Sequence, residues 1–154
     1  MGLDMNLSAH KYLSGYSFVD AAEREAFEKI TDLLGVKADS HSPYLTADVS
    51  IAYWRKANAI HGWFVENCQN GVDDCRSAYV KREQLEELRD LCGEVIEEPG
   101  QAEELLPVAE GFFFGDNTYG ESYFSDIRDT YDMLTRILND ETLKEVDFKY
   151  SSSW

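Results

Sequence analysis

The chain has 154 residues, of which 44% are hydrophobic and 13% aromatic, and its 14 basic and 30 acidic side chains give a net charge of -16. This length is typical of one domain, which buries about two-thirds of the surface that its unfolded form exposes. We therefore expect a single domain over residues 1–154. Because the negative field repels phosphate backbones and anionic lipids, we expect neither direct nucleic-acid binding nor membrane association.

The sequence also predicts the cellular compartment and whether the chain binds a metal. The first residues lack the basic and apolar regions of a secretion signal, and no later stretch approaches 18 consecutive apolar residues. The three cysteines, Cys68, Cys75 and Cys92, form neither a CxxC pair nor an even set. We therefore expect free thiols in a reducing cytoplasm, without structural zinc, other metal or cofactor.

A strand and a helix are the first expected elements. Residues 2–7 alternate apolar and polar side chains, which is typical of a half-buried strand. Asp20 is placed to cap a helix that runs to Leu34, and Gly35 is placed to end it. The mixed β-branched and polar residues of 44–51 favour a short strand or an extended loop.

Three more helices and a terminal strand follow. Helices are expected over residues 53–70, 82–98 and 122–138, and residues 75–80 indicate a brief extended segment. Residues 146–150 alternate like the first strand. The whole predicts an α+β fold in which about four helices pack, largely on one side, on a small antiparallel or mixed sheet that includes the N- and C-terminal strands.

The expected second helix holds the most informative residues. On a helical wheel, Trp54 and His61 share one arc, with Asn58 at its edge. A buried amide or imidazole without a partner costs about 1 to 3 kcal/mol, so both polar groups need partners. Two interpretations stay open: a satisfied core pair, or polar contacts to a ligand.

Arg55 and Lys56 are the only basic residues between Lys37 and Arg76. In the first turn of a helix, beside Trp54, they would hold a phosphate while the aromatic face stacks on a base. The alternative is pairing with neighbouring carboxylates at the surface.

A loop over residues 111–120 brackets three phenylalanines with glycines, which is typical either of a tight turn after a strand or of close backbone approach to a ligand. In the second case, Tyr119 in the loop and Tyr123 after it would line a pocket whose floor is Asn58 and His61. The predicted ligand-binding residues are Trp54, Arg55, Lys56, Asn58, His61, Tyr119 and Tyr123.

The segment from Pro99 to Ile127 has no basic residue. Either its negative charge contributes only to solubility, or the segment is a docking surface for a basic protein, as in a nucleic-acid mimic. The carboxylates of this predicted surface are Glu103, Glu104, Glu110, Asp116, Glu121 and Asp126.

Catalysis has little support in the sequence. The HExxH, GxSxG, Walker and Rossmann patterns are absent. His61 with Asp73, Asp74 or Cys75 would make an acid–base or Cys–His site, but nothing in the sequence brings these groups together. We expect a protein that is not an enzyme.

The opening Met-Gly-Leu-Asp-Met, the segment Tyr-Trp-Arg-Lys-Ala-Asn-Ala-Ile-His, the Gly-Phe-Phe-Phe-Gly loop and the tail Tyr-Ser-Ser-Ser-Trp resemble a family of small uncharacterised proteins of bacteriophages and prophages. Residues 8–43 are the least similar part and are interpreted as a variable insertion. The resemblance implies a counter-defence protein in the cytoplasm of a bacterial host.

Three functions compete in that setting. The first is a binder that sequesters a small nucleotide-derived immune signal without chemistry. The second is an acidic inhibitor that docks on a basic host defence protein, and the third is an enzyme that degrades a nucleotide signal. Pockets of sequestering proteins often lie between subunits, which leaves a homo-oligomer open.

Overall fold

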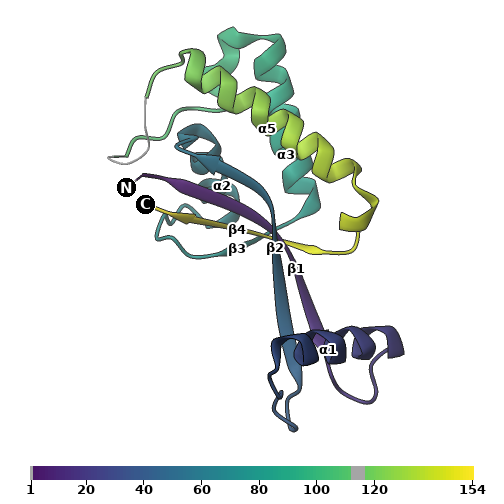
Figure 1. Cartoon of the computed structure of the whole chain (residues 1–154). Helices are drawn as coiled ribbons and strands as arrows, with labels where there is room; N and C mark the ends of the chain where they lie inside the picture. The colour runs from purple at the N-terminus through teal and green to yellow at the C-terminus, as the bar shows by residue number, and fades with distance from the viewer. Residues whose placement is uncertain (1, 112–116) are drawn as a thin grey trace. The chain divides into compact units, whose positions relative to one another are not determined.

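A four-stranded antiparallel sheet organises the computed structural model, which describes residues 2–111 and 117–154 (Figure 1). The strand order is β2-β1-β4-β3. The strands are β1 (Asp4–Ser14), β2 (Tyr44–Arg55), β3 (Ala78–Val80) and β4 (Asp147–Ser153). The expected α+β class is confirmed, and the N- and C-terminal strands are neighbours at the centre of the sheet.

The helices agree with the expected ones except for one additional short helix and one wrong boundary. They are α1 (Ala21–Leu34), α2 (Asn58–Cys68), α3 (Arg82–Glu97), α4 (Ala102–Leu105) and α5 (Glu121–Asn139), with 3₁₀ turns η1 (Pro99–Gln101) and η2 (Glu141–Leu143). The additional helix, α4, is a single turn. Among the described residues, none of the helices combines the length and the apolar character that crossing a membrane requires.

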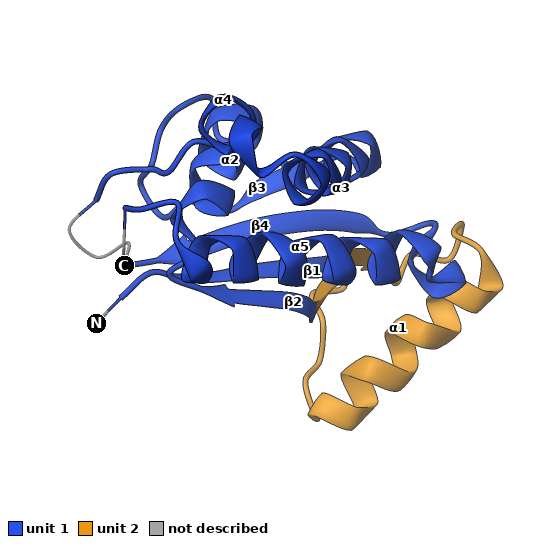
Figure 2. Cartoon of the chain, turned by 90° about the horizontal axis from the view of Figure 1, so that it is seen from above, with its two compact units in different colours: residues 1–9, 50–154 blue, residues 10–49 orange. Residues whose placement is uncertain are grey.

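The chain forms two compact units whose boundaries fall inside β1 and β2 (Figure 2). Unit 1 comprises residues 1–9 and 50–154, and unit 2 comprises residues 10–49. Unit 2 covers most of residues 8–43, the stretch that was interpreted as a variable insertion.

Phe27 is the aromatic side chain that is buried in unit 2. The Gly15 N–H donates to the Pro43 carbonyl oxygen at 2.8 Å, which joins the ends of the two strands. Phe27 of α1 is buried against Gly15, where an added Cβ would lie 2.5 Å from Phe27 Cε1. The helix begins and ends as expected, because the Asp20 carboxylate accepts from the Ala22 N–H and Gly35 is left-handed.

The core of unit 1 lies between the sheet and its helices. α3 and α5 pack side by side over one face of the sheet (Figures 1 and 2). α2 packs on the same face, since the ring of Phe64 stacks on Tyr150 of β4 at 4.0 Å between centroids. Trp54 of β2 reaches α5, where its indole N–H donates to the Thr130 hydroxyl at 2.9 Å.

The expected start of the second helix at Tyr53 is wrong. Residues 53–55 end β2, and α2 begins only at Asn58. The period-two alternation continues through them, with Tyr53 exposed and Trp54 buried. Lys56 then adopts a φ of 60°, a left-handed conformation that separates strand from helix. The boundary between β2 and α2 depends on pairing of β2 with β1. A helical wheel uses only the local sequence, so it contains no information on that pairing.

Candidate functional site

The N-terminus of α2 opens onto a cavity of about 210 Å³, which we call the α2 cavity. One wall is the segment from Arg55 to Ile60, where β2 passes into α2, and the other is the first two turns of α5. The α5 residues that line the cavity are Ser122, Tyr123, Asp126 and Ile127.

The first turn of α2 carries no side-chain cap. Ala57 occupies the N-cap position, and the Asn58 N–H donates to the Lys56 carbonyl oxygen at 2.9 Å. Within the described ranges, the backbone N–H groups of Ala59 and Ile60 have no acceptor. Uncapped N–H groups and the positive end of the helix dipole favour an anion at this position.

Two cations border the same turn. Arg55 Nε lies 4.0 Å from Asp4 Oδ1 in an exposed pair, which contributes little to stability. Lys56 forms no ion pair with any residue that the structure describes, and its aliphatic stem lies beside Gly2. The pair with Asp4 is therefore too weak to hold Arg55, and the side chains of Arg55 and Lys56 are both available to an anion.

Tyr123 and Asp126 form the α5 wall of the α2 cavity. The Tyr123 hydroxyl donates to the Leu106 carbonyl oxygen at 2.8 Å, and burial raises its pKa. Burial, with a smaller contribution from Asp129, raises the pKa of the Asp126 carboxyl to about 6. This carboxyl therefore gains a proton just below neutral pH, which weakens its repulsion of an anion in the cavity.

The structure brings together four of the seven residues predicted to bind a ligand: Arg55, Lys56, Asn58 and Tyr123 line the α2 cavity. Trp54 does not line it, because strand alternation turns its indole into the core, 4% exposed, away from any stacking role. Tyr119 contacts Tyr123 edge-on at 5.0 Å between centroids.

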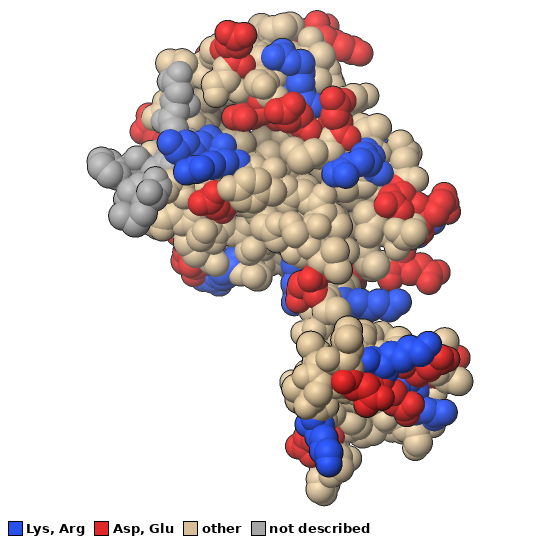
Figure 3. All heavy atoms as spheres, in the orientation of Figure 1, with Lys and Arg blue, Asp and Glu red and all other residues tan. Residues whose placement is uncertain are grey.

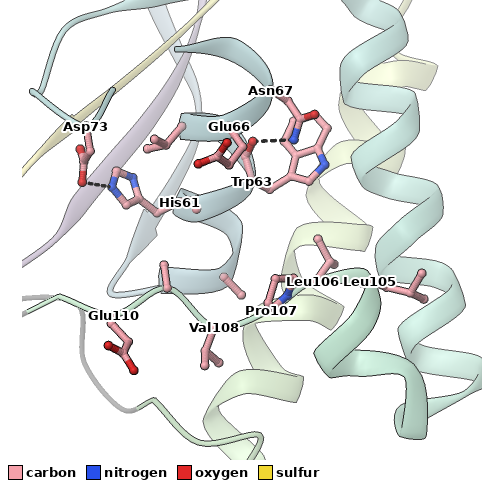
Figure 4. A pocket seen from close by; sticks show the side chains of 14 residues that line it. His61, Trp63, Glu66, Asn67, Asp73, Leu105, Leu106, Pro107, Val108 and Glu110 are labelled. Carbon is pink, nitrogen blue, oxygen red and sulfur yellow. Dashed lines mark hydrogen bonds and ion pairs between the residues drawn. The ribbon is translucent and has the colours of Figure 1, made fainter. Parts of the chain in front are cut away.

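His61 lies at a second and larger cavity, of about 430 Å³, between α2 and residues 105–110; we call it the His61 cavity (Figure 4). The imidazole is 1% exposed. Its Nδ1 lies 2.7 Å from the Tyr150 hydroxyl and its Nε2 lies 3.0 Å from Asp73 Oδ2. The Trp154 indole N–H donates to the other oxygen of Asp73 at 3.2 Å. His61 therefore joins α2, β4 and the loop before β3.

The three partners weighed for His61 in the sequence have different positions. Asp73 is its hydrogen-bond partner. Asp74 instead accepts from Arg76 Nε at 2.7 Å, and Cys75 is exposed. Burial raises the pKa of the Cys92 thiol to about 12, which keeps that thiol protonated.

The predicted acidic surface is divided among several sites. Glu110 lines the His61 cavity with Glu66 and Asp73, whereas Asp126 lines the α2 cavity. Asp116 lies outside the described residues. The exposed members are Glu103, Glu104, Glu110 and Glu121. On the face shown in Figure 3, acidic side chains are interspersed with basic ones and with uncharged surface.

Sequence reasoning missed two parts of these sites. The free N–H groups of Ala59 and Ile60 belong to the backbone, and an alanine at the N-cap position was their signal in the sequence. Asp126 was assigned to a docking surface, although it lines the α2 cavity together with Arg55 and Lys56. No group of His, Cys, Asp and Glu side chains in the described ranges is arranged to hold a metal ion.

Comparison of the chain with protein-family models, with curated proteins and with solved structures finds no match.

Proposed function

We propose that this chain is a binding protein that sequesters a small, phosphate-bearing, nucleotide-derived ligand without chemical change, with the phosphate in the α2 cavity. The observation that carries the proposal is the coincidence of Arg55, Lys56 and an uncapped helix N-terminus around one cavity. In a chain of net charge -16, this is a local site for an anion.

The forces available there suit a phosphate. Arg55 offers a planar fork of donors and Lys56 a point charge, while Ala59 and Ile60 offer backbone N–H groups. Hydrogen bonds to a charged group contribute about 1.5 to 3 kcal/mol each. Micromolar affinity corresponds to about 8 kcal/mol, so several such contacts must act together and also offset the entropy that is lost on binding.

The size of the cavity limits what enters it. A volume of about 210 Å³ is below the roughly 300 to 1,000 Å³ of sites that enclose a drug-sized ligand. The phosphate and its nearest groups therefore enter, and the rest of the ligand lies outside. The buried ring of Tyr123 forms a wall here and does not stack on a base.

The biological setting is part of the proposal and rests on the resemblance to phage proteins. A sequestering protein that acts in the cytoplasm of the infected host needs affinity and abundance, and it needs no catalytic group. Binding of this kind removes a nucleotide immune signal from its receptor by mass action.

Calorimetric titration with ADP and with inorganic phosphate tests the proposal. We expect saturable binding of both, weakened at least about tenfold by Arg55→Ala, which removes about 1.4 kcal/mol or more. Arg128→Ala is the matched control, because Arg128 is an exposed arginine of α5 outside the α2 cavity. Equal binding by Arg55→Ala and wild type would contradict the proposal.

An enzyme that degrades a nucleotide signal is the second candidate, favoured by the contact between His61 and Asp73 at the wall of the larger cavity. Native mass spectrometry of protein from infected cells, followed by denaturation, separates the two candidates. A ligand that is released unaltered supports sequestration, and recovery of a cleaved product supports catalysis.

An acidic inhibitor is the third candidate, favoured by the exposure of Glu103, Glu104, Glu110 and Glu121. Docking on a basic partner would weaken steeply with salt. Replacing Glu103 and Glu104 by lysine would abolish binding of that partner. Unchanged binding by the lysine variant would exclude this candidate.

A further inference from the structure

Exposed apolar side chains gather around the two ends of α1 in unit 2. Phe18, just before the helix, is 80% exposed, and Leu33 in its last turn is 86% exposed. Leu34 and Val36 are 65% and 60% exposed. Single exposed leucines need no explanation, but apolar side chains clustered on one short helix indicate a contact surface.

The apolar stripe of α1 is wider than the part that unit 2 covers. At 100° per residue, Ala22, Ala26 and Leu33 lie within about 40° of one another, and each is about 100° or more from Phe27. Phe27 faces Gly15 and is buried. Ala22 and Leu33 are exposed and Ala26 is half-buried, so this side of the helix is largely uncovered and is available to a partner.

This stripe is complementary to itself. Its N-terminal half carries the small Ala22 and Ala26, and its C-terminal half carries the large Leu33. Two copies packed antiparallel about a two-fold axis place Leu33 of each copy over the alanines of the other, and small residues permit this close approach. The same arrangement brings the end that bears Phe18 beside the end that bears Val36.

Lys29 lies on the same side of α1 as the stripe, about 20° from Ala22, and Glu25 borders it. Both charges fit the same arrangement. Lys29 Nζ lies 2.6 Å from Glu25 Oε1 in an exposed pair. When Leu33 is level with Ala22 of the second copy, Lys29 is within one residue of the level of the second copy's Glu25. Lys29 and Glu25 then pair between copies as well as within one chain.

Repulsion between two copies of an acidic chain is smallest at unit 2. Residues 10–49 hold four basic and seven acidic side chains, a net charge of -3 out of -16. Contact through unit 2 therefore brings together surfaces that carry little net charge.

We infer that two copies of this chain associate through α1, packed antiparallel with Leu33 of each over Ala22 and Ala26 of the other. One helix and its flanks form an interface at the low end of the size range, below roughly 1,200 Å² in total, which is typical of weak and transient association. The inference does not depend on the α2 cavity.

Sedimentation velocity of the full chain, from about 10 to 500 µM at physiological salt, tests the association. We expect the average mass to rise from 17.6 kDa toward twice that value. Leu33→Glu should keep the chain monomeric throughout, with an unchanged circular dichroism spectrum. Val72→Glu, at an exposed apolar position of unit 1, should dimerise like wild type. A wild-type monomer at the highest concentration, or a dimer that survives Leu33→Glu, would overturn the inference.

Cysteine cross-linking tests the antiparallel register. In a Cys75→Ser background, the double variant Ala22→Cys, Leu33→Cys should form a disulfide-linked dimer on mild oxidation. The two positions are 11 residues apart on one helix, about 16 Å, so they do not bridge within one chain. Efficient cross-linking of the Leu33→Cys single variant would show that the two Leu33 residues meet, which contradicts the register.

Discussion

The backbone N–H of Lys56 donates to the carbonyl oxygen of Leu3 at 2.8 Å, although Lys56 itself has a φ of 60°. This bond joins the end of β2 to the start of β1 immediately before α2 begins. The left-handed residue therefore sets the direction in which the helix N-terminus and the Lys56 side chain face the α2 cavity.

Two substitutions of Lys56 test its charge and its left-handed backbone conformation separately. Lys56→Gly permits the left-handed conformation, so we expect the unfolding free energy to stay within about 1 kcal/mol of wild type while phosphate binding weakens. Lys56→Val should destabilise the fold by about 1 to 2 kcal/mol, because a β-branched residue is strained there. Urea denaturation and calorimetry measure the two effects. Equal stability of the glycine and valine variants would contradict the backbone role.

The sequence predicted the elements whose signals are local. The cap at Asp20, the terminator at Gly35 and the apolar periodicity of residues 122–138 each act within a few positions, and the structure has α1 and α5 there. The start of α2 depends on a hydrogen bond to Leu3, more than fifty positions away, which local periodicity does not contain.

The residues of the candidate site also fall into two groups, those with a local signal in the sequence and those whose position depends on the fold. Two adjacent cations in an acidic chain identified Arg55 and Lys56, and both line the α2 cavity. The environment of His61 depends on Asp73 and Tyr150, which approach it only through the fold. Residue type thus indicated which side chains are candidates for binding, but not which cavity each one lines.

The pKa of Asp126, raised by burial to about 6, makes both stability and binding depend on pH. Its value in the unfolded chain is near 3.8, so the folded state binds the proton more tightly. The stability from this group is fully present below about pH 4 and is lost as the pH rises through about 6. We expect Asp126→Asn to be more stable than wild type at pH 7, with the difference shrinking toward pH 4.

Phosphate binding supplies an independent measurement of the same group. Loss of the Asp126 charge removes repulsion from the α2 cavity, so Asp126→Asn should bind ADP more tightly than wild type at pH 7.5. Asp132→Asn is the matched control, since Asp132 is an exposed carboxylate of the same helix that does not line the α2 cavity. Weaker binding by Asp126→Asn would show that the carboxylate itself contacts the ligand.

Gly15 tests the packing inside unit 2. Because an added Cβ would lie 2.5 Å from Phe27 Cε1, Gly15→Ala forces the buried ring to move, which costs about 1 to 3 kcal/mol. Shortening the ring with Phe27→Leu should recover part of the loss in the double variant. Gly100→Ala, where an added Cβ meets nothing within 4 Å, is the control for the alanine itself. Additive losses in the double variant would place the cost elsewhere than in this contact.

Tyr150 tests whether His61 is held by its buried partners. Tyr150→Phe keeps the stacking on Phe64 but leaves His61 Nδ1 without its hydroxyl, so we expect a loss of about 1 to 3 kcal/mol in unfolding free energy. Tyr12→Phe, at an exposed tyrosine of β1, should change stability by less than about 0.5 kcal/mol. Because His61 lies outside the α2 cavity, phosphate affinity should be the same in Tyr150→Phe and wild type. A Tyr150→Phe variant as stable as wild type would mean that the buried imidazole is satisfied without the hydroxyl, and lost phosphate binding would mean that the two cavities act on one ligand.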